Sequence, residues 1–146
     1  MSQYAAIADM ERARGTEHVR SLSDKDNIGT RVDAALNEAL ARASSLADSY
    51  IDKKYEVPLG NPPDYLIAAV IDIAEYQLAP DSMIGTENMR TRYEDALKLF
   101  KEIGKGNVTL AGNSPALSGQ VEGATGSKGV QMVAPERLFT RNSEIL

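Results

Sequence analysis

The chain has 146 residues, of which 42% are hydrophobic, 25% charged and 5% aromatic, and its formal net charge is −5. It contains no cysteine, which excludes disulfides and thiolate zinc sites. A net negative charge argues against tight binding to a phosphate backbone, and no segment approaches the length of a membrane-spanning run. The polar, acidic first residues do not resemble a signal peptide. We therefore expect one domain with a modest core, made in a reducing cytoplasm and without a membrane partner.

Helix-forming residues dominate residues 1–110 and predict an all-α body of four helices. Residues 4–14 predict a short first helix that ends at Gly15, a residue suited to helix C-termini. A polar loop is expected at 21–29. Residues 32–54 carry apolar side chains at three- and four-residue steps, which predicts a long second helix.

The third and fourth helices are expected at 65–78 and 86–103. Residues 65–78 are apolar nearly all round, so we interpret them as the central buried helix. Residues 86–103 carry one apolar stripe and predict an amphipathic helix. The tyrosines Tyr50, Tyr76 and Tyr93 fall on apolar stripes, which favours core packing over a base-stacking platform.

The sequence changes character after the body. Residues 111–129, AGNSPALSGQVEGATGSKG, have no helical or alternating period and predict a flexible linker. Residues 130–146 contain apolar side chains again and predict an extended C-terminal docking arm, the alternative being a disordered segment without function. The division is thus a helical body at 1–110, a linker at 111–129 and an arm at 130–146. Candidate contact residues of the arm are Val130, Met132, Val133, Arg137, Leu138, Phe139, Arg141, Ile145 and Leu146.

One acidic segment resembles a metal loop. Asp24 to Gly29 begins like a calcium loop, with carboxylates at its first and third positions and glycine at its sixth. Its fifth position is Ile28 and its twelfth is Ala35, so two side-chain ligands are missing. An Asx-rich turn is the favoured interpretation, and a calcium site is the alternative.

Two titratable residues stand out on their own. Asp72 lies on the most apolar helix, where a buried carboxylate could act as an acid or base. No second catalytic group accompanies it at a readable spacing, so we expect a structural ion pair, with Arg92 or Arg90 as partner. His18 is the only histidine and is expected at the surface. The sequence therefore predicts no enzyme, no catalytic residue, no cofactor and no metal.

Several segments, taken in order, resemble the family of Mu-like phage neck proteins. They are YAAIADM, LSDKD, IDKKYEVPL, VIDIAEYQL and RYEDALKLFKEIGKGNVTL, and RLFTRNSEIL resembles the closing segment of that family. The resemblance covers the whole body. One departure is the residue before Gly15, where the family more often carries an aromatic side chain than an arginine.

The resemblance implies a head-to-tail adaptor, a head-completion protein in the neck of a tailed phage. Such a protein binds beneath the portal protein, forms a ring of about twelve copies through contacts between neighbouring copies, and offers a platform to a tail-proximal neck or tail-completion protein. DNA would pass through the ring without specific binding. We thus expect assembly in the host cytoplasm and a final location in the virion, between capsid and tail.

Two other functions remain open from the residues alone. A small helical nucleic-acid-binding regulator would need a basic face, which the net charge of −5 disfavours. A metal-dependent module could be built on Asp24, Asp26 and Asp72, although these residues do not share a known ligand spacing.

Overall fold

A computed structural model of the protein describes residues 2–79 and 86–116. These residues form no strand and five helices, which are α1 (Ile7–Arg14), α2 (Thr16–Ser23), α3 (Asp33–Ile51), α4 (Asp64–Leu78) and α6 (Glu87–Lys105). The predicted all-α class is confirmed, but the described part holds five helices where four were expected. No helix in that part is long and apolar enough to cross a membrane.

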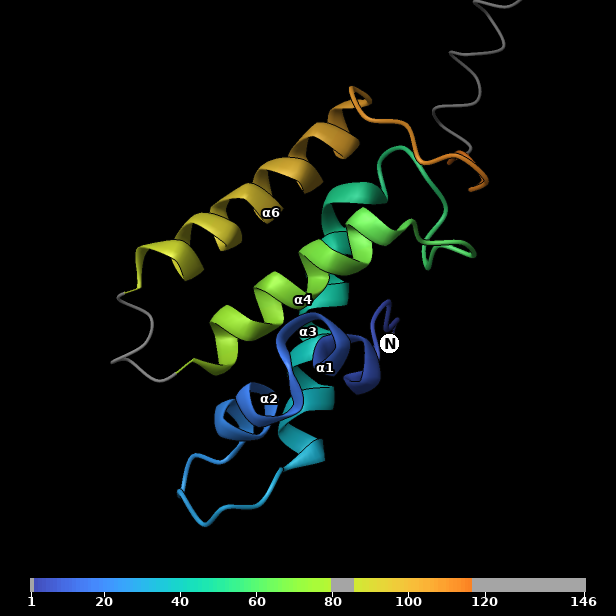
Figure 1. Cartoon of the computed structure of the whole chain (residues 1–146). Helices are drawn as coiled ribbons and strands as arrows, with labels where there is room; N and C mark the ends of the chain where they lie inside the picture. Colours follow the sequence, from blue (N-terminus) through green and yellow to red (C-terminus); the bar gives the residue numbers. More distant parts are fainter. Residues whose placement is uncertain (1, 80–85, 117–146) are drawn as a thin grey trace, which may run out of the picture.

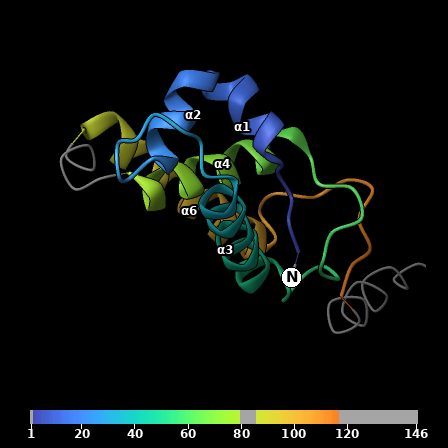
Figure 2. The ribbon, with the colours of Figure 1, turned by 90° about the horizontal axis from the view of Figure 1, so that it is seen from below.

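The helix α4 is the centre of the molecule. It lies between α6 on one side and the α1–α2 pair on the other, with α3 packed along it (Figure 1). A view from below shows α3 beside α4 and α6, with α1 and α2 together at another side (Figure 2). The buried side chains come from all five helices and include Met10, Val19, Leu22, Leu36, Leu40, Ile51, Leu66, Ile73, Phe100 and Ile103. The prediction that residues 65–78 form the central buried helix is therefore confirmed.

Alanine residues let the long helices approach each other. Ala39, Ala43 and Ala47 lie one turn apart on α3 and are completely buried. On the other side of the core, the rings of Tyr76 and Tyr93 stack with centroids 4.2 Å apart and join α4 to α6. The predicted core packing is confirmed for Tyr50 and Tyr93, which lie against the buried cluster, while Tyr76 is half-buried and stacks on Tyr93.

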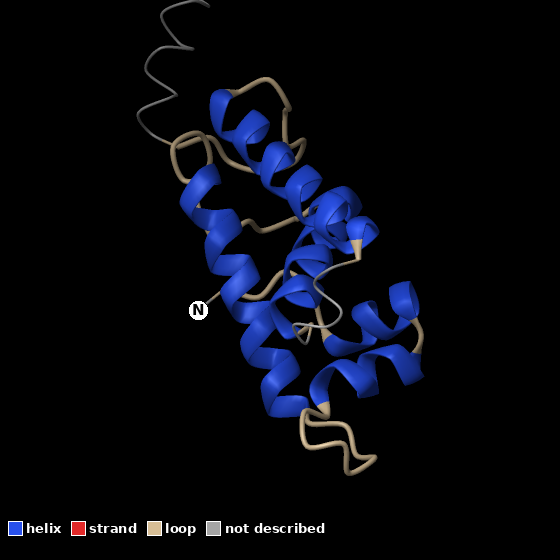
Figure 3. Ribbon diagram, turned by 90° about the vertical axis from the view of Figure 1, so that its left-hand side faces the viewer, coloured by secondary structure: helices blue, strands red, loops and turns tan. Residues whose placement is uncertain are grey.

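The helix α2 was not predicted. Gly15 adopts a positive φ of 92° and ends α1, as expected, but the chain then turns directly into a second short helix. Val19 and Leu22 of α2 are buried, whereas a polar loop was expected from residue 21. An eight-residue helix is unstable alone, so these apolar contacts, not helix propensity, stabilise α2. The α1–α2 pair lies against the lower part of α3 (Figure 3).

The described part of the body extends past Leu110 to residue 116. The backbone N–H of Glu56 donates to Ser114 O (2.9 Å), and that of Ala116 donates to Lys54 O (2.8 Å). The amide of Asn113 donates to Asn61 O (2.9 Å). The first six residues of the predicted linker therefore lie along the connector between α3 and α4, and the rest of the linker falls outside the described residues.

The helices α3 and α6 meet most closely at Gly104. A Cβ atom at this position would lie 2.4 Å from the backbone oxygen of Tyr50, a distance that requires the two helices to separate. We expect Gly104→Ala to lower the free energy of unfolding by about 1–3 kcal/mol, despite the better helix propensity of alanine. Urea denaturation followed by circular dichroism measures the change.

The matched control is Gly60→Ala, because a Cβ at Gly60 meets nothing within 4 Å. Its effect should stay within about 0.5 kcal/mol. Equal effects of the two substitutions would show that the close approach of α3 and α6 does not limit stability.

Candidate functional site: an ion-pair cluster between the helices

A single carboxylate lies at the centre of the polar interior. Glu75 of α4 is only 1% exposed, although it belongs to the most apolar helix. Its Oε2 accepts hydrogen bonds from Arg14 Nε (2.8 Å) and from Arg92 Nη2 (2.9 Å). Its Oε1 lies 2.7 Å from His18 Nε2. Because a buried charge is costly unless it is paired, these three partners explain how Glu75 is tolerated in the core.

Asp72 completes the cluster one turn earlier on α4. Its carboxylate forms an ion pair and hydrogen bond with Arg14 and lies 3.4 Å from Arg92 Nε. The predicted structural ion pair is therefore confirmed with Arg92 as one partner, and Arg14 is a second that was not predicted. We call these five residues, Arg14, His18, Asp72, Glu75 and Arg92, the ion-pair cluster.

The placement of His18 corrects the prediction of a surface histidine. Its side chain is 33% exposed and one ring nitrogen contacts the buried Glu75. The ionised carboxylate can only accept, so the ring nitrogen facing it must carry the proton. The prediction was wrong because α2, which brings His18 back onto α4, was not expected.

The two carboxylates of the cluster have opposite pKa shifts. Burial by itself would raise the pKa of Glu75, but the hydrogen bonds from Arg14 and His18 and the charges of Arg14 and Arg92 outweigh it. The pKa of Glu75 therefore lies below its usual value of 4.5. Burial raises the pKa of Asp72 above 3.8, because the two arginines offset it only in part and the charge of Glu75 adds to the rise. Glu75 is thus the member that holds its charge most firmly.

The acidic segment at Asp24 is a turn. Asp24 Oδ1 accepts a hydrogen bond from Ile28 N (2.9 Å), and Oδ2 accepts one from Gly29 N (2.6 Å). The carboxylate closes the turn, as the Asx interpretation predicted. Within residues 2–79 and 86–116, no group of three or more His, Asp or Glu side chains could hold a metal ion.

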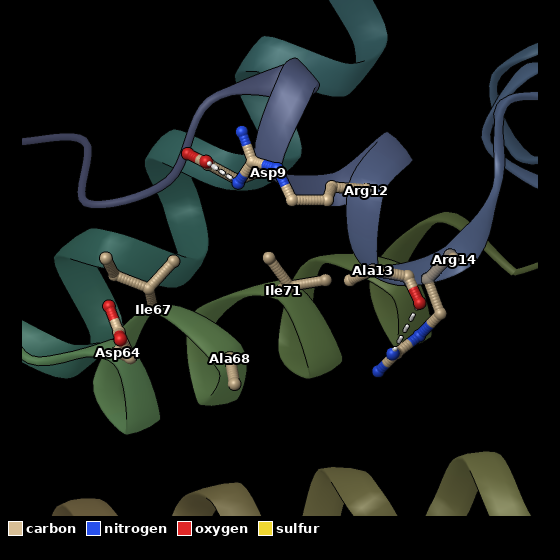
Figure 4. Close-up of a pocket in the computed structure, with 8 residues that line it drawn as sticks. All are labelled: Asp9, Arg12, Ala13, Arg14, Asp64, Ile67, Ala68 and Ile71. Atoms are coloured by element: carbon tan, nitrogen blue, oxygen red, sulfur yellow. Dashed lines mark hydrogen bonds and ion pairs between the residues drawn. The ribbon is translucent and has the colours of Figure 1, made fainter.

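A groove of about 430 Å³ lies beside the cluster, between α1 and α4 (Figure 4). Its α4 side presents the apolar side chains of Ile67, Ala68 and Ile71 with Asp64 at one end, while its α1 side carries the ion pair of Asp9 with Arg12 (2.9 Å). No serine, cysteine or histidine lines the groove. An apolar floor with a charged rim is typical of surfaces that contact other proteins.

The predicted contact residues of the arm cannot be placed relative to the cluster. All nine lie outside the described residues: Val130, Met132, Val133, Arg137, Leu138, Phe139, Arg141, Ile145 and Leu146. Sequence reasoning did not identify Glu75 as a buried carboxylate with several partners. The available signal was its spacing of three residues from Asp72, which places both carboxylates on one face of an otherwise apolar helix.

The fold and the cluster define a small all-α protein whose helices are joined by buried ion pairs. The chain belongs to a family of phage proteins, because residues 4–128 match the family described as Bacteriophage Mu, Gp36. A similar protein is the Mu-like prophage FluMu protein gp36 of Haemophilus influenzae, which is 29% identical over 111 residues. The match covers 76% of this chain and 74% of that protein. The resemblance to a Mu-like phage family is thereby confirmed.

Removing the charge of Glu75 should destabilise the fold. Glu75→Gln keeps the side-chain shape but leaves Arg14 and Arg92 with Asp72 as the one carboxylate that they share in the cluster. These arginines are 23% and 33% exposed, so water offsets part of the loss. We expect the free energy of unfolding to fall by about 2–3 kcal/mol in urea denaturation. The control is Glu94→Gln, which breaks an exposed pair with Arg90 and should cost about 0.5 kcal/mol or less.

Ionisation of Glu75 also predicts that the free energy of unfolding depends on pH. The pKa of Glu75 is lower in the folded than in the unfolded chain, so its contribution is complete above pH 4.5 and is lost as the pH falls through the folded value. Asp72, whose pKa is raised in the wild type, acts in the opposite direction. The stability difference between the wild type and Glu75→Gln should therefore shrink below pH 4.5. Denaturation curves at several pH values test this, and a constant difference would contradict it.

Proposed function

We propose that the protein is a structural head-to-tail adaptor of a tailed phage, a head-completion protein of the neck. Its membership of the Bacteriophage Mu, Gp36 family carries this proposal, together with a relative that is a Mu-like prophage protein. In this role copies of the chain form a ring under the portal protein, continue the DNA channel and present a platform for tail attachment. Its place is then in the virion, between capsid and tail.

The body has properties that suit a structural role. Its polar interior is used for ion pairs and hydrogen bonds that join α1, α2, α4 and α6. A component of a ring must keep its shape while it contacts several partners, and buried ion pairs between helices support that requirement.

The charge of the body suits the passage of DNA. Residues 1–110 contain 18 acidic and 13 basic residues, counting Asp and Glu against Lys and Arg. A wall with this balance repels the phosphate backbone on average and does not hold it. A nucleic-acid-binding regulator, by contrast, needs a broad basic face, and every arginine of the described residues is engaged with a carboxylate.

The partners of the proposed adaptor are the portal protein, neighbouring copies of the chain and a tail-proximal neck or tail-completion protein. We assign the arm at 130–146 to docking on the portal or on the adjacent copy. Apolar side chains such as Leu138 and Phe139 would be buried in that contact, while Arg137 and Arg141 would form charge-assisted bonds to an acidic neighbour.

Deleting the gene from a producing phage tests the adaptor role directly. We expect DNA-filled heads and free tails that do not join, and added purified protein should restore the joining. Electron microscopy of the particle neck should show the chain as a ring beneath the portal. If purified particles lacked the polypeptide, or joined their tails without it, the proposed function would be wrong.

A truncation after Ala116 tests the arm separately. The truncated body keeps every described contact, so its circular dichroism and unfolding should match those of the full chain. Incorporation into particles should fall at least about tenfold, equivalent to 1.4 kcal/mol of contact energy. The matched control is the full chain with Ser118→Ala and Ser127→Ala, which changes only the linker and should incorporate normally. Full incorporation of the truncated body would refute the arm but not the adaptor.

A further inference from the structure

The positive charges of the body fall into two groups. All seven arginines among the described residues lie within 4.0 Å of a carboxylate. Of the six lysines in the same part of the chain, only Lys105 does so, at 3.3 Å from Glu102. Five of the six lysines lie at or near the C-terminal ends of α3 and α6, namely Lys53, Lys54, Lys98, Lys101 and Lys105. The lysines, unlike the arginines, are therefore largely free to meet an external anion.

Three of these lysines line one hollow. It has a volume of about 230 Å³ and is formed by Tyr50, Lys53, Lys101, Gly104 and Lys105, with no carboxylate among its lining residues. The ends of α3 and α6 meet here, at the same end of the molecule (Figure 1). Because Gly104 has no side chain, the space between the lysines stays open. The hollow is thus a concentration of positive charge on a protein that is negative overall.

Helix capping does not account for the three lysines. Lysine is common near helix C-termini because it interacts with the last carbonyl groups. Here several of those carbonyls already have backbone donors. At the end of α6, Gly106 N donates to Ile103 O and Asn107 N to Glu102 O, both at 2.9 Å. At the end of α3, Tyr55 N donates to Ile51 O at 3.0 Å. Among the described residues, none of the three ammonium groups donates to a terminal carbonyl, and Lys105 donates to the Glu102 side chain instead (3.3 Å).

The three lysines also repel one another in the isolated chain, which is unfavourable for folding. Lys101 and Lys105 are four residues apart on one helix, a spacing at which like charges repel. Lys53 adds a third charge from the neighbouring helix end. Glu102 offsets one of the three through its pair with Lys105. An anion in the hollow would relieve the repulsion that remains.

We propose that this lysine hollow binds a phosphate group, either of a DNA backbone or free in solution. Lysine is a flexible point charge and a common ligand of phosphate. The volume is below that of typical small-molecule sites and suits a single small anion. Three lysines neutralise at most about three phosphate charges, so binding to DNA is weak, independent of sequence and sensitive to salt. The site goes beyond the proposed function, because an adaptor does not require it.

The test uses the full chain and a short fluorescent duplex DNA, followed by anisotropy at a series of salt concentrations. We expect a dissociation constant on the order of 10⁻⁴ M and a log–log salt slope of roughly −2 to −3. The variant Lys53→Ala/Lys101→Ala/Lys105→Ala should bind at least about tenfold more weakly, because each lost lysine reduces the slope by about one. All three positions are exposed, so the variant should fold normally, which its circular dichroism would show.

The matched control removes three positive charges elsewhere, by Lys25→Ala, Arg42→Ala and Arg90→Ala. These positions are also exposed, so net charge changes equally while the hollow stays intact. A second control, the triple lysine-to-arginine variant at positions 53, 101 and 105, should keep most of the binding. An equal loss in the charge-matched control would overturn the proposal, since binding would then depend on net charge alone.

Inorganic phosphate distinguishes the two sources. In NMR titrations at constant ionic strength, phosphate should shift the backbone amides of Gly104 and Lys105, and chloride should not. Shifts with phosphate but no binding of DNA would support the hollow as a site for free phosphate. No response to either ligand would overturn the proposal. So would a stronger response to a glutamate-rich peptide, which would assign the hollow to an acidic protein surface. Each of these outcomes leaves the deletion test of the adaptor unaffected.

Discussion

The fold depends on how the charge of Glu75 is neutralised. A carboxylate that is 1% exposed on an apolar helix is unfavourable unless its partners come to it. Those partners are supplied by three different helices, α1, α2 and α6. A buried ion pair is weak evidence for net stability, because apolar side chains could fill the same space. What the contacts define is geometry, since a single carboxylate joins α1, α2 and α6 to α4.

Amphipathic patterns predicted the elements whose stability comes from their own long apolar stripes. The helices α3, α4 and α6 were expected close to their observed positions, because 15 to 19 residues give the helical period enough repeats. The eight-residue α2 lacks such repeats, and the glycine before it was correctly interpreted as a helix end. Nothing local indicated that the chain would resume a helix at once. The helix α2 is stabilised by the tertiary contacts of Val19 and Leu22, which local sequence patterns do not show.

Only part of the ion-pair cluster could be predicted from the sequence, namely the pair of Asp72 with Arg92. Asp72 could be recognised as a charge that needed a partner, and Arg92 follows it by 20 residues on the next helix. Arg14 and His18, however, lie 61 and 57 residues before Glu75, and they reach it only because α1 and α2 fold together. Arg14 contacts both carboxylates of the cluster, which a planar guanidinium with several donors can do.

The arginines and the lysines of this protein have different physical roles. Arginine offers several donors in a planar fork and is used where carboxylates must be held in fixed geometry, as at Glu75 and Asp72. Lysine is a more strongly hydrated point charge, and here it is mainly placed at one end of the body without fixed partners. An acidic protein that only had to stay soluble would have no reason to collect lysines there, because repulsion among them opposes folding. The arginines are therefore used in ion pairs within the fold. The lysines where α3 and α6 meet remain available for contacts with other molecules.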